Sequence, residues 1–239
     1  MPRVGVISPS PRGLKAEDLV RLLPPEVALE LGSCGIVNGT REELERSFAE
    51  FEAEIARMAQ LSVDLVHPAG VPFLLLGHEG EAALVRRWED RFGVPVFTNG
   101  MSQVNALRAF GARRVLAASY FPAEMNAAFR RYLEQAGFEV LACEGLGVPF
   151  ADVPRVPADA VRQFLDTLHA RHRGADALYL VGPAWRPTLD MIDALEDAYG
   201  IPVVPHVPAQ SWEIQRRLAL RRPMAGFGRL LRDLPGCAE

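Results

Sequence analysis

Short apolar runs alternate with amphipathic stretches along the whole chain, and this alternation limits most strongly the folds that are open to it. The run at residues 4–8 precedes a helical stretch at 16–23, and the run at 27–31 precedes a longer stretch in which apolar residues recur every three or four positions between 44 and 58. Further runs lie at 65–67, 94–97, 115–119, 139–143, 177–181 and 201–204. Strands that alternate with helices favour parallel sheets covered by helices on both faces.

The chain also repeats itself at an offset near 110 residues. Residues 3–4 return at 114–115, residues 68–72 at 183–187, and residues 89–96 at 196–203, in the same order. The last match covers eight positions and reads as the end of a helix, a glycine and a strand in both copies. All βα units look alike to some degree, but an eight-residue match flanked by two others favours duplication. The sequence predicts an α/β protein of two pseudo-symmetric lobes, each a parallel four-stranded sheet flanked by helices.

The length of 239 residues fits two lobes of about 110 residues. We expect residues 1–99 with 208–239 to form the first α/β lobe and residues 100–207 to form the second. Ligands of open parallel sheets bind beyond the carboxyl ends of the strands, so we expect a site in the cleft between the lobes. The loops expected to line it are 8–12, 33–38, 67–72, 98–102, 120, 182–186 and 206–210.

Composition excludes several classes of partner. The net charge is −4 and no basic tract is present, so we expect neither nucleic acid nor an anionic membrane surface as a partner. The longest apolar run, residues 71–76, is far shorter than the roughly 20 residues that cross a bilayer. The first residues lack the apolar core of a signal peptide, and three widely spaced cysteines suit a reducing compartment. These features predict a cytoplasmic protein, and a homo-oligomer is compatible with them.

Motifs for common cofactors are missing. No phosphate-binding loop is present, and no G-x-G-x-x-G opens a helix after a strand. His169 and His172 lie three residues apart, as half a metal site could, but cations near the end of a helix are the commoner explanation. No G-x-S-x-G motif indicates a serine hydrolase. We therefore expect neither a metal nor another cofactor.

Several short segments carry a resemblance to a known family. They lie at residues 3–7, 105–108, 111, 113–115, 118–120, 126, 188–190, 200–204, 208–209, 212 and 226–230. In order and spacing they resemble the aspartate/glutamate racemase superfamily, most closely its maleate isomerase and arylmalonate decarboxylase branch. The resemblance implies two pseudo-symmetric lobes, a small carboxylate as ligand, and cofactor-free chemistry at cysteine thiolates, whose pKa can be tuned close to neutrality.

The resemblance also places the family's two cysteine positions, which fall on Pro68 and Pro183. A shift of one residue moves the first to His67 or Ala69 and the second to Gly182 or Ala184, and no cysteine lies within several residues of either loop. The sequence thus predicts that both catalytic cysteines are missing. Cys34 and Cys143 follow or end predicted strands and could reach the site, although a free cysteine is more often a small core residue.

Other parts of the family's site remain. The resemblance assigns substrate-carboxylate binding to Tyr120 and places Pro9 in the first loop. Backbone amides before two predicted helices could bind an anion, and further residues follow predicted strands. Arg186 could pair with a carboxylate or lie on an exposed loop, and Trp185 could line the pocket or pack in the core. The predicted substrate-binding residues are Pro9, Ser10, Ala69, Gly70, Val71, Asn99, Ala184, Trp185 and Arg186.

Without a thiolate, another group must move the proton. His67 is the best candidate because imidazole titrates near neutral pH, and a structural histidine at a strand end is the alternative. His206 is a weaker candidate, and His78 with Glu79 weaker still. We expect a cofactor-independent isomerase or decarboxylase that transfers a proton beside a carboxylate, with His67 and Tyr120 as its catalytic residues. A protein that binds a small carboxylate without turnover is the alternative.

Overall fold

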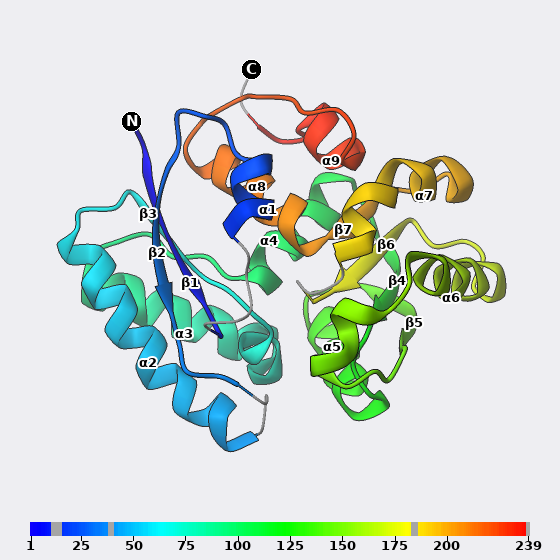
Figure 1. Ribbon diagram of the computed structural model, residues 1–239, viewed down its shortest axis with the longest axis horizontal. Helices are drawn as coiled ribbons and strands as arrows, with labels where there is room; N and C mark the ends of the chain where they lie inside the picture. Colours follow the sequence, from blue (N-terminus) through cyan, green and yellow to red (C-terminus); the bar gives the residue numbers. More distant parts are fainter. Residues whose placement is uncertain (11–15, 38–40, 183–185, 238–239) are drawn as a thin grey trace. The chain divides into compact units, whose positions relative to one another are not determined.

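The computed structural model describes residues 1–10, 16–37, 41–182 and 186–237, and these residues form two compact units, 1–101 and 102–239. In the first unit, β1 pairs with both neighbours in parallel, in the order β2-β1-β3. The helix α2 contacts all three strands (Figure 1). The elements are β1 Arg3–Ser8, α1 Ala16–Leu22, β2 Ala28–Ser33, α2 Arg41–Gln60, β3 Leu65–Pro68, the 3-10 helix η1 Pro72–Leu76, α3 Gly77–Phe92 and the start of α4 Asn99–Ala109.

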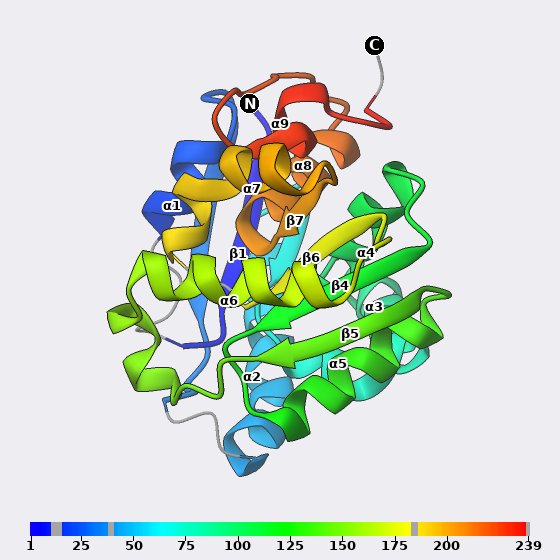
Figure 2. The same cartoon turned by 90° about the vertical axis from the view of Figure 1, so that its right-hand side faces the viewer.

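The second unit holds a four-stranded parallel sheet in the order β5-β4-β6-β7, which Figure 2 turns toward the viewer. Its elements are β4 Arg114–Ser119, α5 Ala123–Gln135, β5 Glu139–Gly145, η2 Phe150–Arg155, α6 Ala158–Arg171, β6 Ala177–Val181, η3 Arg186–Met191, α7 Ile192–Tyr199, β7 Val203–Pro205, α8 His206–Arg217 and α9 Gly228–Asp233. The parallel sheets and covering helices confirm the predicted fold class. None of the described helices is long and apolar enough to cross a membrane.

The core of the first unit lies between its sheet and the helices α2 and α3. Val66 of β3 belongs to this core, together with Phe51 of α2 and Trp88 of α3. Successive residues of a strand point to opposite faces of the sheet. His67 therefore faces away from the α2 and α3 core, although it too is fully buried.

The first sheet differs from the prediction of four strands. Its fourth position is reduced to one parallel bridge between Val66 and Val96. The N–H of Val66 donates to the Pro95 carbonyl at 2.9 Å, and the N–H of Phe97 donates to the Val66 carbonyl at 3.1 Å. The next donor of this parallel pattern would be the N–H of residue 68, which is a proline, so the ladder ends there.

The C-terminal segment also differs from the prediction, because residues 208–237 group with the second unit and not with the first. Helix α9 contacts α7, α8 and β7. The N–H of Gly228 donates to Asp193 at 2.8 Å and the N–H of Arg229 donates to Glu196 at 2.8 Å, so two carboxylates of α7 bind the start of α9.

The two copies of the sequence repeat contain equivalent hydrogen bonds. Glu196 Oε1 accepts the N–H of Val203 at 2.9 Å, just as Glu89 accepts the N–H of Val96. In each copy a glutamate in the last turn of a helix binds the backbone N–H seven residues later. The eight-residue match therefore corresponds to the same helix-to-strand turn, which occurs once in each unit.

We expect Glu196→Ala to destabilise the protein by about 2 kcal/mol, because the N–H groups of Val203 and Arg229 both lose their acceptor. Glu89→Ala is the matched control, which deprives only the Val96 N–H of this acceptor, and should cost about 1 kcal/mol. Urea unfolding followed by circular dichroism measures both. Equal losses for the two variants would contradict this account.

Candidate functional site

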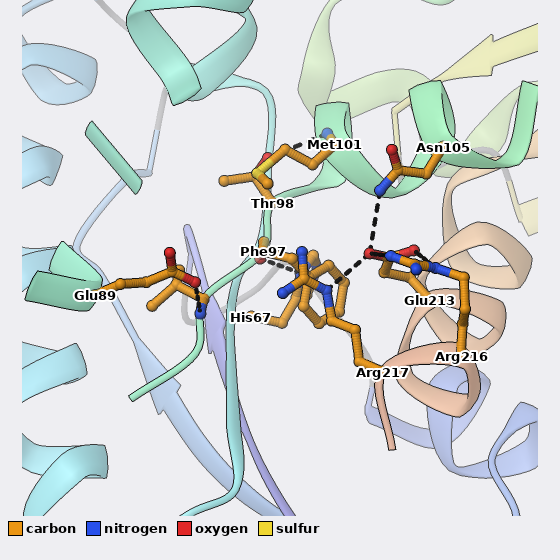
Figure 3. Close-up of polar contacts among 10 residues, drawn as sticks. His67, Glu89, Phe97, Thr98, Met101, Asn105, Glu213, Arg216 and Arg217 are labelled. Carbon is orange, nitrogen blue, oxygen red and sulfur yellow. Dashed lines mark hydrogen bonds and ion pairs between the residues drawn. The ribbon is translucent and has the colours of Figure 1, made fainter. Parts of the chain in front are cut away.

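His67 lies on β3 and is completely buried. Its ring stacks on Phe97, with the centroids 4.4 Å apart and the planes at 28°. Its Nδ1 lies 2.9 Å from the carbonyl oxygen of Phe97 (Figure 3). A carbonyl oxygen can only accept, so Nδ1 must carry a proton and Nε2 is the basic nitrogen of the neutral ring. The Phe97 carbonyl therefore fixes the tautomer in which Nε2 can take up or release a proton.

The loop after β3 carries three of the predicted anion donors. The N–H of Ala69 donates to the carbonyl of Ile7 at 2.9 Å, and the N–H of Gly70 donates to Asn99 Oδ1 at 2.5 Å. Val71 immediately precedes η1. Two of the three amides therefore already have acceptors within the first unit, and an anion could bind them only by displacing these bonds. Their role in binding stays a prediction.

The first loop supports this arrangement from β1. A side-chain carbon at Gly70 would lie 2.9 Å from Cγ of Pro9, and Gly70 has a φ of +111°, so only glycine fits here without strain. The buried Ser10 exchanges two hydrogen bonds with Ser8, whose hydroxyl accepts from the Ser10 N–H and donates to its carbonyl. The predicted residues Pro9, Ser10 and Gly70 thus lie in neighbouring loops, and Asn99 at the start of α4 binds the second of them.

A buried carboxylate that the sequence analysis missed fixes the segment next to His67. Thr98 donates its hydroxyl to Glu81 Oε1 at 2.6 Å and accepts the N–H of Met101 at 3.3 Å, the second bond being drawn in Figure 3. Glu81 and Thr98 are both fully buried. One sequence signal could have revealed Glu81, since Leu84, Val85 and Trp88 follow at helical spacing and place the carboxylate on the apolar face of α3.

Tyr120 follows β4 in the second unit and is 1% exposed. Its ring contacts Phe121, with the centroids 4.3 Å apart. It also lies directly against Gly182, where a side-chain carbon would be 2.5 Å from Cε1 and 2.8 Å from the hydroxyl oxygen. Gly182 has a φ of +104°, so both space and backbone conformation require glycine.

Both units therefore use the same construction at the carboxyl ends of their central strands. The residue after the first strand, Pro9 or Tyr120, packs on a glycine of positive φ that follows the neighbouring strand, Gly70 or Gly182. Offsets of 111 and 112 residues relate the pairs (9 to 120, and 70 to 182). Tyr120 is the member of this set that places a polar side-chain group there.

Other candidates are less informative. His206 is buried at the first residue of α8, His78 is half-buried and Glu79 is exposed at the start of α3. Pro183, Ala184 and Trp185 lie outside the described residues, and for Arg186 the structure describes only the backbone, at the start of η3. Among the described residues, no group of three or more His, Cys, Asp or Glu side chains could hold a metal ion.

A second polar cluster in Figure 3 lies within the second unit. The fully buried Glu213 of α8 accepts hydrogen bonds from Asn105, Arg216 and Arg217, at 2.7 to 3.2 Å for Oε1. The bonds from two guanidinium groups and one amide compensate the buried carboxylate. This cluster joins α4 to α8 and has no part in the predicted site.

The cysteines lie away from the ends of β3 and β6. Cys34 follows β2, and Cys143 lies on β5, so each belongs to the edge strand on the far side of the first strand of its sheet. Burial, as the largest cause, raises the pKa of both thiols to about 12. Both thiols are therefore protonated at pH 7. Burial also raises the pKa of Cys237.

The model of the arylmalonate decarboxylase family matches residues 4–231, nearly the whole chain. The chain belongs to the arylmalonate decarboxylase family. Arylmalonate decarboxylase of Bordetella bronchiseptica is 27% identical over 235 residues, which cover 96% of each chain.

Two solved structures share the fold of this chain. A double mutant of arylmalonate decarboxylase in the liganded form has a TM-score of 0.89 at 24% identity and covers 98% of this chain and 100% of its own. The maleate cis-trans isomerase of Nocardia farcinica, solved as a mutant with a covalently bound succinylcysteine intermediate, has a TM-score of 0.82 at 24% identity over 97% and 98% of the two chains. The maleate isomerase of Nocardia farcinica is also 30% identical over 131 residues, which cover 54% of this chain and 51% of its own. A decarboxylase and an isomerase as relatives support an enzyme of the isomerase or decarboxylase type.

Proposed function

We propose that this protein moves a proton at the carbon next to a carboxylate of a small carboxylic or dicarboxylic acid, as a decarboxylase or isomerase without a catalytic thiolate. The observation that carries the proposal is the His67 tautomer. Its Nδ1 is bound to the Phe97 carbonyl, which leaves Nε2 as the proton-transfer atom. His67 also adjoins Pro68, the position where the family resemblance places the first cysteine.

In this proposal an imidazole takes the role of the cysteine thiolate. The isomerase of Nocardia farcinica carries a succinyl group on a cysteine, whereas here Pro68 ends β3 and Gly182 follows β6. The thiols of Cys34 and Cys143 are protonated at neutral pH because burial raises their pKa to about 12. A protonated, buried thiol is a poor nucleophile and a poor base. Imidazole, by contrast, both accepts and donates a proton near neutral pH.

The two reaction types share one charged intermediate. In a decarboxylation, the bond between the carbon and one carboxylate breaks, CO₂ leaves, the electron pair of that bond forms an enediolate with the remaining carboxylate, and an imidazolium Nε2–H of His67 protonates the carbon. In an isomerisation by proton transfer, the neutral Nε2 removes the proton from the carbon next to the carboxylate and returns it to another carbon of the same conjugated intermediate, so that a double bond changes position. The enediolate places negative charge on the oxygens of the remaining carboxylate, and the Tyr120 hydroxyl is the donor proposed to stabilise them.

A ligand screen coupled to a turnover assay tests this function. Thermal shift against small mono- and dicarboxylates, with phenylmalonate and maleate included because the relatives are named for such compounds, identifies the acids that bind. Proton NMR in D₂O then detects product or exchange of the proton next to the carboxylate. We expect exchange or product for at least one binding acid. Stabilisation by an acid with neither product nor exchange would overturn the proposal in favour of binding without turnover.

A further inference from the structure

The side chain of Asn126 forms hydrogen bonds with the loop that carries Tyr120. It lies in the first turn of α5 and is 3% exposed. Its Oδ1 accepts the hydroxyl proton of Ser119 at 2.6 Å, and its Nδ2 donates to the carbonyls of Phe121 at 2.9 Å and Pro122 at 3.1 Å. One amide thus binds residues on both sides of Tyr120.

The end of β5 closes this network from the other side. A side-chain carbon at Gly145 would lie only 2.5 Å from Nδ2 of Asn126 and 2.8 Å from Oγ of Ser119. The N–H of Leu146 donates to the Ser119 carbonyl, and the N–H of Val148 donates to the Tyr120 carbonyl, each at 3.0 Å. The backbone of residues 119–121 is therefore held between α5 and the segment after β5.

Only an amide satisfies all three contacts of Asn126. The Ser119 hydroxyl already accepts the N–H of Phe121 at 2.9 Å and must donate its own proton to an acceptor. The two carbonyls need donors. Aspartate offers the acceptor without the donors and would place a negative charge against two carbonyl oxygens. Alanine removes all three side-chain bonds, and the Pro122 carbonyl then keeps only the backbone N–H of residue 126.

We infer that Asn126 is a positioning residue, which holds the Tyr120 hydroxyl where the substrate carboxylate binds. The inference rests on the proposed function for the role of Tyr120 and goes beyond it by naming what sets its position. The ring of Tyr120 lies directly against Gly182, so its position depends on the backbone of residues 119–121. Loss of the three bonds frees the loop and moves the hydroxyl.

A double-mutant cycle separates positioning from general stability. The dissociation constants of maleate and phenylmalonate are measured by calorimetry for wild type, Asn126→Ala, Tyr120→Phe and the double variant. We expect each single change to weaken binding about tenfold or more. The double variant should bind no more weakly than Tyr120→Phe alone, because Asn126 acts through the hydroxyl. Multiplied losses in the double variant would overturn the inference.

Further variants show whether a loss of binding comes from misfolding, and a measurement without ligand tests the role of Asn126 if the proposed function fails. Ser119→Ala removes the hydroxyl that donates to Asn126 and should weaken binding less than Asn126→Ala does. Ser119→Thr keeps the hydroxyl and should restore binding. Asn105→Ala, which removes a bond to Glu213 instead, is the matched control and should leave binding unchanged. Hydrogen exchange gives a readout without ligand, and Asn126→Ala should speed exchange of the Phe121 and Val148 amides at least tenfold.

The two claims can fail separately. If wild type binds neither acid, the proposed function is contradicted for both, and the exchange rates decide the positioning claim alone. Unchanged exchange at Phe121 and Val148 in Asn126→Ala would overturn that claim whatever the binding result.

Discussion

His67→Asn lowers the rate of proton exchange or product formation about 10³-fold while the fold remains intact. Asparagine can still donate a hydrogen bond from Nδ2 to the Phe97 carbonyl, so the contact made by Nδ1 is preserved. It has no atom that can replace Nε2 as a base or acid. The variant therefore removes the proton-transfer group and keeps the structural bond. NMR exchange rates in D₂O, with KM measured alongside kcat, give the result.

Two companion variants complete this test. His67→Ala removes both the base and the bond to Phe97, so it should be as inactive as His67→Asn and less stable. Thermal unfolding should therefore rank the two variants while their residual rates agree. A His67→Asn protein that turns over at the wild-type rate would make His67 a structural residue only, as its complete burial also allows.

Gly182→Ala should lower kcat/KM about 10²-fold, the second large effect. The added methyl group would lie 2.5 Å from Cε1 of Tyr120, closer than two carbon atoms can approach, so the phenol ring must move. The φ of +104° adds backbone strain. Steady-state kinetics on the acid found in the screen measures the loss.

Gly200→Ala separates displacement of the ring from strain alone. Gly200 also has a positive φ, of +73°, but a side-chain carbon there meets no atom within 4 Å. This control should lose about 1 kcal/mol of stability and retain its kcat/KM. If Gly182→Ala behaves as Gly200→Ala does, Tyr120 has no part in catalysis.

The sequence pattern predicted most of the fold because local rules determine it. The βα alternation and the repeat of residues 89–96 at 196–203 correctly predict parallel sheets and two similar units. The fourth strand of the first sheet was predicted from Val94 to Phe97, where apolar residues suit a strand. The ladder ends because the next donor falls on Pro68 of the neighbouring strand, and strand propensity along residues 94–97 does not report which residue of another strand lies opposite.

The candidate site was predictable only in part. His67 and Tyr120 could be placed at strand ends because strands follow from periodicity. Glu81 and Asn126 were assigned no role, since each acts on a segment contributed by another element: Glu81 of α3 binds Thr98 before α4, and Asn126 of α5 binds residues around Tyr120. Such contacts depend on how helices pack on strands, which is not visible in spacing along the chain.

Removal of every thiol tests most directly the claim that the reaction needs no catalytic thiolate. The variant Cys34→Ala, Cys143→Ala and Cys237→Ala should keep the exchange or turnover rate of wild type within about threefold, because none of the three groups transfers the proton and the two most perturbed have a pKa of about 12. For the same reason, the rate of wild type should show no ionisation step from these two thiols between pH 7 and 10. Loss of turnover in a cysteine-free protein that still folds and binds the acid would contradict the account.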